Sequence, residues 1–410
     1  MIPLPLDELE GLGEVAGDGH VTGLHIDSRR AGPGDLFVAI RGGRDFVADA
    51  RARGAATLVP DDEFGAMAAI GRLLRDRTAA RIVGVTGSTG KTSTKDILAA
   101  LCAPVVRTVA TEGSYNAELG VPLTLGRLEP DTELCIVEMG MRGAGQIAEL
   151  CEIARPDAGV ITAVGPVHLE LVGSVEAVAR TKAELVASLP PGGVAVVPDA
   201  RDLDPYLRDD LDVRRVGLVD VELRDDGAHV AFAGRRIRFP LGSRHQAQNA
   251  LTALTTYEGL GLPLDRLEES AASVRLSPWR GEELDLPGGG FVVNDAYNAN
   301  PTSMEAALRH LAERGGGRRR VAVLGGMAEL GAHAERHHRE IAELAAELGI
   351  EVLAVGELAR AYGGDAWVPD AAAALAAARE LVRPGDAVLV KASRAVALEG
   401  IAPALANGSS

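Results

Sequence analysis

The sequence predicts an α/β protein of several domains, and three observations support this prediction. The chain has 410 residues, which is too long for one ordinary domain. Hydrophobic residues make up 47% of the chain and aromatic residues only 3%, so we expect aliphatic cores of the kind found in layered α/β proteins. From residue 81 onward, apolar runs alternate with segments of helical periodicity, which predicts parallel sheets with crossover helices.

The same alternation divides the chain into three domains, which we place at residues 1–79, 80–275 and 276–410. Apolar runs predict strands at residues 23–28, 35–40, 54–60, 81–86, 133–139, 158–164, 193–198, 291–297, 319–326, 351–356 and 386–393. Helical periodicity predicts helices at residues 91–102, 145–154, 175–189, 248–261, 303–314, 337–349 and 371–382. Residues 221–240 alternate with period two around a glycine turn, which predicts a hairpin.

Charge and composition exclude several classes of protein. With 42 basic and 58 acidic residues, the net charge is −16 at pH 7, so no basic footprint indicates a nucleic-acid partner. The N-terminus has no basic start, and no apolar run approaches about 18 residues, so we expect neither a secretory signal nor a membrane span. We therefore expect a cytoplasmic protein and, by default, a monomer. Cys102, Cys135 and Cys151 lie in apolar segments and are predicted to be buried thiols.

The segment GVTGSTGKTSTKD, Gly84 to Asp96, predicts a phosphate-binding loop. A glycine-rich turn between a strand and a helix lets backbone N–H groups surround phosphate oxygens, and the helix N-terminus adds partial positive charge. Lys91 would reach the outer phosphates and Thr92 would hold Mg²⁺. The loop is a T-G-x-x-G-K-T variant that uses Gly87 and Gly90. This context favours nucleotide binding over an ordinary turn, but a loop alone does not distinguish a kinase from a ligase.

Three residues are further candidates for the phosphate site, and each has an ordinary structural alternative. Glu138 ends a predicted strand, where ligands gather in open α/β sheets, and its hard oxygens suit Mg²⁺. It could equally be an acid near a helix start. Taken alone, His168 is more typical of a structural histidine and Lys182 of a solvated helix lysine. His333 and His337 lack the glutamate position of a zinc-protease helix and are predicted to share an ordinary helix face.

Taken together, the motifs resemble the Mur ligase family, whose members use ATP to form peptide-like bonds in bacterial cell-wall precursors. The likeness covers nearly the whole chain, in the family's order: IDSRRAGPGDLFVAI, GVTGSTGKTSTKD, ELGVPLTL, IVEMGMRGAGQIAEL, HLELVGSVEAVARTKAEL, GSRHQAQNALTAL, PWRG, NDAYNANPTSM, VLGGMAELG and VLVKASRAVALE. The resemblance implies an N-terminal domain for the UDP-linked substrate, a central P-loop domain with a parallel sheet, and a Rossmann-like C-terminal ligase domain.

The resemblance also implies roles for individual residues. ATP contacts are implied for Gly87, Ser88, Thr89, Gly90, Lys91, Thr92, Ser93, Asn249, Arg280 and Asp295. Mg²⁺ ligands are implied at Thr92, Glu138, His168 and Lys182. Substrate contacts are implied for Asp27, Ser28, Arg29, Asn116, Asn298, Lys391, Ser393 and Arg394. Catalytic roles are implied for Lys91, Lys182, His168 and Arg280. Within these sets Asn249 would contact adenine, Asp295 the ribose and Arg280 the γ-phosphate, and residues 391–394 would face the substrate side of the cleft.

At the position of Lys182, the family carries a lysine that CO₂ carbamylates, and the resemblance implies the same modification here. An ammonium group would repel Mg²⁺, whereas a carbamate offers two anionic oxygens. The modification requires a neutral amine, which burial among other cations favours.

Within the family, the chain most resembles the member that joins D-alanyl-D-alanine to UDP-N-acetylmuramoyl-tripeptide. The segment DAYNANPTSM favours this member. The Asp-Asn-Pro-Arg stretch of the member that adds the third amino acid is absent from the sequence. The chain departs from the pattern at Ser114 and Ala117, which replace asparagines, at Gly326, which replaces an aspartate, and in a shorter segment after residue 46. The alternatives are the third-residue ligase, a folate or amino-acid-polymer ligase, and a P-loop ATPase that is not a ligase.

Overall fold

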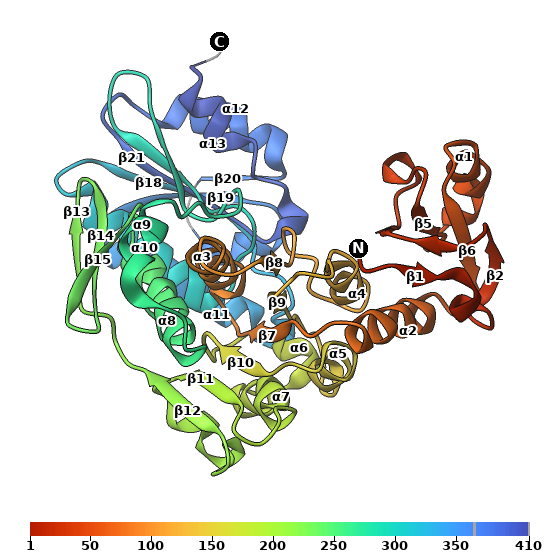
Figure 1. Ribbon diagram of the computed structural model, residues 1–410. Helices are drawn as coiled ribbons and strands as arrows, with labels where there is room; N and C mark the ends of the chain where they lie inside the picture. The colour runs from red at the N-terminus through yellow and green to blue at the C-terminus, as the bar shows by residue number, and fades with distance from the viewer. Residues whose placement is uncertain (364–365, 409–410) are drawn as a thin grey trace.

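The structure is a computed structural model that describes residues 1–363 and 366–408 (Figure 1). Its N-terminal part contains a sheet of order β2-β6-β5-β4, in which β2 runs antiparallel to β6 and the other pairs are parallel. The elements are β1 (Leu4–Pro5), β2 (Gly13–Ala16), β3 (His20–Val21), β4 (Gly23–His25), β5 (Asp35–Val38), α1 (Val47–Ala52) and β6 (Ala56–Pro60). The three predicted strands are present, and the strands that sequence reasoning missed, β1 to β3, are short.

The central sheet is parallel throughout, in the order β12-β11-β10-β7-β9-β8. Its strands are β7 (Arg81–Thr86), β8 (Thr108–Ala110), β9 (Leu134–Glu138), β10 (Ala158–Ile161), β11 (Val194–Pro198) and β12 (Asp212–Val216). The helix α2 (Glu63–Asp76) precedes this part, whose own helices are α3 (Lys91–Cys102), α4 (Gly120–Leu125), α5 (Gln146–Ala154), α6 (Leu169–Val172), α7 (Val175–Ala187), α8 (Arg244–Gly259) and α9 (Leu267–Ala272).

Helices cover both faces of this sheet, which is why its strands read as nearly continuous apolar runs. Val83 and Val85 of β7 pack with residues of α3 and α8, whereas Ile82 packs in the cluster that contains α5. Because β7 lies inside the sheet and its neighbours β10 and β9 run parallel to it, their carboxyl ends meet at one edge. Ligands bind at this edge in open α/β sheets.

Residues 221–240 form three antiparallel strands rather than the single predicted hairpin. The strands are β13 (Val221–Arg224), β14 (Gly227–Phe232) and β15 (Arg235–Phe239), paired in sequence order. The missed turn is Ala233–Gly234, in which both residues have positive φ, at +48° and +73°. A two-residue turn of this hand suits a hairpin, but alanine is an unusual residue for its first position, so the sequence indicated only the turn before Gly227.

The C-terminal sheet has the order β16-β17-β21-β18-β19-β20, with one antiparallel pair, β16 and β17, at its edge. Its strands are β16 (Glu282–Asp285), β17 (Phe291–Asn294), β18 (Arg320–Gly325), β19 (Ile350–Val355), β20 (Trp367–Val368) and β21 (Ala387–Lys391). The helices α10 (Pro301–Gly315) and α11 (Ala334–Glu347) pack on one face, and α12 (Ala371–Leu381) and α13 (Ile401–Ala406) on the other. The predicted α/β class is confirmed in all of these layers.

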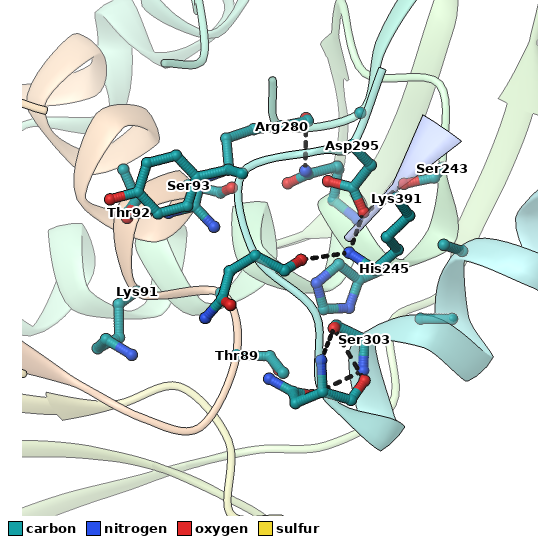
Figure 2. A pocket seen from close by; sticks show the side chains of 18 of the residues that line it. Thr89, Lys91, Thr92, Ser93, Ser243, His245, Arg280, Asp295, Ser303 and Lys391 are labelled. Atoms are coloured by element: carbon teal, nitrogen blue, oxygen red, sulfur yellow. Dashed lines mark hydrogen bonds and ion pairs between the residues drawn. The ribbon is translucent and has the colours of Figure 1, made fainter. Parts of the chain in front are cut away.

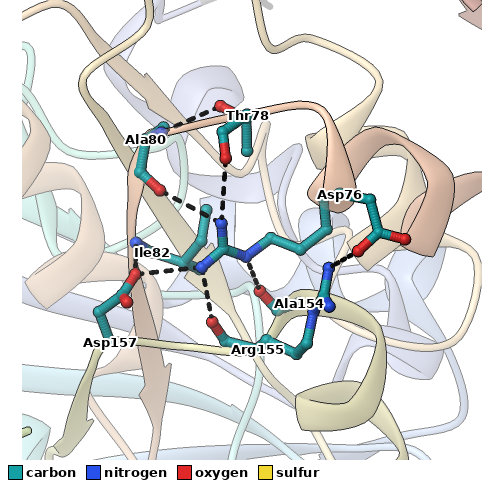
Figure 3. A network of polar contacts seen from close by, with 8 residues as sticks. Asp76, Thr78, Ala80, Ile82, Ala154, Arg155 and Asp157 are labelled. Atoms are coloured by element: carbon teal, nitrogen blue, oxygen red, sulfur yellow. Dashed lines mark hydrogen bonds and ion pairs between the residues drawn. The ribbon is translucent and has the colours of Figure 1, made fainter. Parts of the chain in front are cut away.

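The junction near residue 79 is tightly packed, because α2 lies against α4 and α5 of the central part (Figure 1). Arg75 of α2 donates hydrogen bonds at this junction, and Figure 3 shows the groups that accept them on Ala154, Arg155 and Asp157. Its guanidinium donates hydrogen bonds to the carbonyl oxygens of Ala154 at 2.9 Å and Arg155 at 3.1 Å, and to the Asp157 carboxylate at 3.3 Å. The same carboxylate accepts the backbone N–H of Ile82 at 2.7 Å, which ties the network to the start of β7. The domain limits themselves stay a prediction.

Two smaller expectations can be compared directly with the fold. The three cysteines are free and buried, and burial raises the pKa of each thiol to about 12, so they are inert core residues. Within residues 1–363 and 366–408, every helix is too short or too polar to span a bilayer.

We expect the substitution Arg75→Met to lower the free energy of unfolding by about 1–2 kcal/mol, because it removes the hydrogen bonds to the Ala154 and Arg155 carbonyl groups and to the Asp157 carboxylate. Urea unfolding followed by circular dichroism measures the change at the first transition. Arg72→Met on the exposed face of the same helix is the matched control, with an expected change below about 0.5 kcal/mol. Equal effects of the two substitutions would contradict a special role for the Arg75 network.

Candidate active site

The phosphate loop joins β7 to α3 at the carboxyl edge of the central sheet, as predicted. Its two glycines are required by close packing. Gly87 has φ +148°, and a Cβ atom there would lie 1.9 Å from Thr162 Oγ1. Gly90 has φ +82°, and a Cβ atom there would lie 2.3 Å from Asn249 Oδ1. Since no side chain fits at either position, the loop backbone approaches two neighbouring segments more closely than other residues allow.

Hydrogen bonds hold the loop against the segment that follows β10. The Ser88 N–H donates to Ala163 O at 2.8 Å, and Ser88 Oγ accepts the Gly165 N–H at 3.0 Å. Thr162 Oγ1 donates to Thr89 O at 2.5 Å. Lys91 Nζ folds back and donates to Gly87 O at 2.8 Å, so its ammonium lies across the loop where phosphate oxygens would bind.

A cavity lies between this loop and the C-terminal sheet, and we call it the P-loop cavity (Figure 2). Figure 2 shows Lys91 and Thr92 on one side of it and His245, Asp295 and Lys391 on the other. Its lining also includes Ser88, Thr89, Gly90, Ser93, Asn116, Glu138, Ser243, Gln246, Arg280, Tyr297, Asn298, Asn300, Ser303 and His310. The cavity therefore joins the phosphate loop to most of the residues predicted to bind ATP, although these residues come from segments about 200 positions apart.

Arg280 crosses the boundary between the central and C-terminal parts. Its Nη2 donates to Thr92 Oγ1 at 2.9 Å, and its guanidinium lies 3.8 Å from the centre of the Tyr297 ring. This stacking and the bond from Gln246 Nε2 to Arg280 O at 3.1 Å orient the arginine toward the loop. Its position agrees with the predicted contact to the γ-phosphate, which stays a prediction.

Lys391 lines the P-loop cavity, and the substrate contact that the resemblance implies for it stays a prediction. Its Nζ contacts Asp295 Oδ2 at 2.5 Å and donates to Asn298 O at 3.0 Å, and only 2% of the residue is exposed. The reason is register, because β21 ends at Lys391 and points its side chain at Asp295, which follows the adjacent β17. Ser393 and Arg394 lie beyond the strand and line a different cavity.

This second cavity adjoins the first, and we call it the adjoining cavity. Both cavities are lined by Ser88, Lys91, Asn116, Tyr297, Asn298 and Asn300. The adjoining cavity alone is lined by His168, Arg142, Glu329, Ser393 and Arg394. The two spaces thus meet at Lys91, where the outer end of a bound triphosphate and a second substrate would come together.

Glu138 and Thr92 supply oxygen atoms suited to a hard cation at the P-loop cavity. Glu138 is 1% exposed, its Oε1 accepts Asn116 Nδ2 at 2.8 Å, and its buried Oε2 has no hydrogen-bond partner among the described residues. This unpaired anionic oxygen fits Mg²⁺. The described residues contain no cluster of three His, Cys, Asp or Glu ligands, so a cation here would also need phosphate oxygens or a modified side chain.

Lys182 of α7 is the side chain for which the resemblance implies carbamylation. It is 2% exposed, and within the described residues no carboxylate lies within ion-pair distance of its amine. Burial lowers the pKa of Lys182 well below its usual value, and the nearby charge of Lys91 lowers it further. The same desolvation lowers the pKa of Lys91 itself. The neutral amine that carbamylation requires is therefore favoured at Lys182, whereas the carbamate itself stays a prediction.

His168 follows β10 and enters the adjoining cavity. It has φ +53°, and its Nδ1 contacts Glu329 Oε2 of the C-terminal part at 2.5 Å. The interaction lowers the pKa of Glu329. Since Glu138 lines only the P-loop cavity and His168 only the adjoining one, the two predicted metal ligands approach the shared boundary at Lys91 from different sides.

Asn249, which is predicted to contact adenine, does not line either cavity. Asn249 is 4% exposed and packs beneath Gly90, and its amide donates to Gln246 Oε1 at 3.0 Å. Gln246 and His245 of the same helix, together with its N-cap residue Ser243, line the cavity in its place. The sequence could not separate these positions, because helix residues one turn apart share a face. The adenine contact of Asn249 stays a prediction.

The N-terminal motif residues likewise line neither cavity among those described. Asp27 accepts hydrogen bonds from the Arg29 backbone and guanidinium, which lower the pKa of its carboxyl to about 2, and Ser28 Oγ donates to Asp49 at 3.3 Å. These contacts stabilise the loop at residues 27–30 that contains the motif. Arg41 is the N-terminal residue that reaches the adjoining cavity, and sequence reasoning missed it.

One departure from the family pattern, Gly326, has a local structural explanation. A Cβ atom at Gly326 would lie 2.6 Å from Leu358 Cβ, so an aspartate would not fit with this backbone. Ser114 contacts the hydroxyl of Tyr297, and Ala117 lines the adjoining cavity. Asn116, the asparagine that remains, orients Glu138 through its side-chain amide.

Lys95 is a further residue that sequence reasoning missed. It is 2% exposed, it pairs with Asp96 at 2.7 Å, and it donates to Thr111 O at 2.7 Å, which anchors the loop that carries Asn116. A compositional signal was available. Only four of the 42 basic residues are lysines, namely Lys91, Lys95, Lys182 and Lys391, and all four lie at or beneath this site.

We expect Gly87→Ala to weaken ATP binding at least about tenfold, because strained backbone and the contact with Thr162 would displace the loop at a cost of about 1–3 kcal/mol. Gly143→Ala is the matched control, since a Cβ atom there meets open space and the glycine has no positive φ. Isothermal titration calorimetry with ATP measures both variants. Unchanged affinity in Gly87→Ala would remove the close-packing argument.

Two family descriptions match the chain, the Mur ligase middle domain over residues 85–257 and the Mur ligase, glutamate ligase domain over residues 279–394. The UDP-N-acetylmuramoyl-tripeptide–D-alanyl-D-alanine ligase of Mycobacterium tuberculosis is 36% identical over 94% of this chain and 92% of its own. The ligase of that name from Escherichia coli is 32% identical over 99% of both chains.

Solved structures agree with these relatives. A crystal structure of MurF from Acinetobacter baumannii covers 99% of both chains, with 26% identity and a TM-score of 0.87. MurF ligase from Thermotoga maritima in complex with ADP covers 94% of this chain and 97% of its own, with 27% identity and a TM-score of 0.82. The phosphate loop, the split cavity and these similarities together show that the chain belongs to the Mur ligase family.

Proposed function

We propose that this chain joins D-alanyl-D-alanine to UDP-N-acetylmuramoyl-tripeptide, with conversion of ATP to ADP and phosphate. The observation that carries the proposal is the meeting of two cavities at Lys91, one beside a phosphate loop and one open to a second substrate. The names of full-length relatives at 32–36% identity supply the substrates. The acting species in the proposal is a cytoplasmic monomer.

The chemistry explains why a phosphate loop serves an amide ligase. A carboxylate resists attack by an amine, because its negative charge repels nucleophiles and oxide is a poor leaving group. Transfer of the γ-phosphoryl group to the tripeptide carboxylate produces an acyl phosphate, whose leaving group is phosphate. The dipeptide amine then attacks the acyl carbon, and the tetrahedral intermediate collapses to the amide. Positioning and charge neutralisation are the main demands of phosphoryl transfer.

The site residues meet these demands in the proposal. Lys91 and Arg280 neutralise the charge of the transferring phosphoryl group from opposite sides of the cleft. Mg²⁺, when bound, would supply further charge neutralisation, held by Thr92, Glu138, His168 and carbamylated Lys182. Asp295 and Asn249 are assigned to the nucleoside, together with the loop residues 87–93.

The substrate side of the proposal uses the adjoining cavity. Asn116, Asn298, Ser393 and Arg394 line it, and we assign them to the peptide end of the UDP-linked substrate. Asp27, Ser28 and Arg29 are assigned to the uridine end, and Lys391 acts through Asp295. Because the cavities are built from both sides of a cleft, closure would assemble the site and exclude water from the acyl phosphate.

The test of the function is phosphate release from ATP and Mg²⁺ with UDP-N-acetylmuramoyl-tripeptide, with and without D-alanyl-D-alanine. We expect release that depends on the dipeptide and equals amide formation in amount. Release with UDP-muramoyl-dipeptide and a diamino acid would instead assign the chain to the preceding step. Steady release that ignores every amine would overturn the ligase proposal.

We expect Lys182→Ala to abolish nearly all ligase activity and a small added carboxylate, such as formate or acetate, to restore part of it. The carboxylate would replace the anionic oxygens that the carbamate contributes. Arg180→Ala, an exposed position on the same helix, is the control and should retain activity. Full activity of Lys182→Ala would contradict both the carbamate and its proposed role.

A further inference from the structure

Glu329 forms a contact across the cleft that the proposed mechanism has not used. Its Oε2 lies 2.5 Å from His168 Nδ1, and its Oε1 lies 3.6 Å from the Arg142 guanidinium. His168 and Arg142 belong to the central part, whereas Glu329 follows β18 in the C-terminal part. All three side chains line the adjoining cavity.

The backbone on both sides is shaped for this contact. His168 has φ +53° and Glu329 has φ +62°, and both values are uncommon for residues with a side chain. The Glu170 N–H donates to Glu329 O at 3.4 Å, and a Cβ atom at Gly331 would lie 3.0 Å from Glu170 Cβ. Two left-handed turns from different parts of the chain therefore pack directly against each other and hold the carboxylate on the imidazole.

The contact determines which imidazole nitrogen can bind a metal. The two atoms are close without the alignment of a hydrogen bond, but the negative charge beside Nδ1 favours the tautomer with its proton on Nδ1, and the lone pair is then on Nε2. Histidine ligands of protein metals commonly donate their other N–H to a carboxylate, which fixes the ring orientation and raises its basicity. The unpaired Oε2 of Glu138 shows that this site suits a cation.

We propose that Glu329 is a positioning residue that orients His168 as a Mg²⁺ ligand when the C-terminal domain closes on the central domain. The inference rests on the proposed function for the task of the metal, and it adds a group from the opposite domain to the metal site. Closure would then complete the metal site as well as the walls of the cleft. An open cleft leaves His168 without its carboxylate and free to rotate.

The experiment measures Mn²⁺ binding by electron paramagnetic resonance on the full chain, with the ATP analogue AMP-PNP at saturation. His168→Ala defines the binding that depends on this histidine. We expect Glu329→Ala to weaken that binding about tenfold or more, and Glu329→Gln to weaken it less, because an amide oxygen can take the place of the carboxylate oxygen beside Nδ1. Adding Glu329→Ala to His168→Ala should change the affinity less than twofold, because Glu329 acts through the histidine.

Glu335→Ala is the matched control, since Glu335 forms an exposed ion pair with Arg339 on α11 of the same domain. It should leave Mn²⁺ affinity unchanged. Unchanged affinity in Glu329→Ala, or equal losses with and without His168, would overturn the proposal. If Glu329→Ala lowers the unfolding temperature, the nearly isosteric Glu329→Gln replaces it as the test. Weaker Mn²⁺ binding in Glu329→Gln than in the unmodified protein would then support the proposal, and unchanged binding would overturn it. These results do not depend on amide formation, so dipeptide-dependent phosphate release by the unmodified protein tests the proposed function separately.

Discussion

The close approach of two glycines to their neighbours determines where every other part of the site lies. Gly87 touches the residue that follows β10, and Gly90 touches Asn249 of α8, so the loop is held from both sides before any nucleotide arrives. Asn249 in turn bonds Gln246, which lines the far end of the cavity and donates to Arg280 O. The phosphate end and the nucleoside end of the cavity are therefore linked through one helix. A shift of the loop would displace residues at both ends.

The second constraint is electrostatic. The chain is acidic overall, yet its four lysines are gathered at or beneath one site, and three of them are 2% exposed. Arginine keeps its proton under all ordinary conditions, whereas a buried lysine can lose it. Burial lowers the pKa of Lys91 and Lys182, so both ammonium forms are disfavoured in the folded protein relative to the unfolded chain. This penalty is largest below the depressed pKa and falls as pH rises, and bound phosphates would offset it by favouring the charged form of Lys91.

The sequence predicted the α/β layers and the phosphate loop better than the contacts between distant segments. Periodicity located four of the six strands in each large sheet and missed β8, β12, β16 and β20, and the loop pattern located Lys91 and Thr92 on the correct edge. It missed the turn at Ala233, because alanine rarely adopts positive φ there. It also missed Arg41, Lys95 and Glu329, whose roles depend on which segments meet in space rather than on local pattern. The cavity that Lys391 lines could not be predicted for a similar reason, because the register of β21 against β17 determines where its side chain lies.

Many groups proposed to bind ligands are already paired across the cleft. Arg280 bonds Thr92, Tyr297 contacts Ser114, and Glu329 contacts His168. Each pair joins the central part to the C-terminal part, so the two sides of the cleft contact each other through their own polar groups. Ligands would therefore exchange these contacts for new ones, and their affinity would reflect only the difference between the two sets. Such a cleft can open to admit substrates without a large loss of free energy, while the correct pair of substrates still favours closure. A site divided between two domains can link phosphoryl transfer to the arrival of the second substrate, because closure then assembles the groups that act on the phosphoryl group.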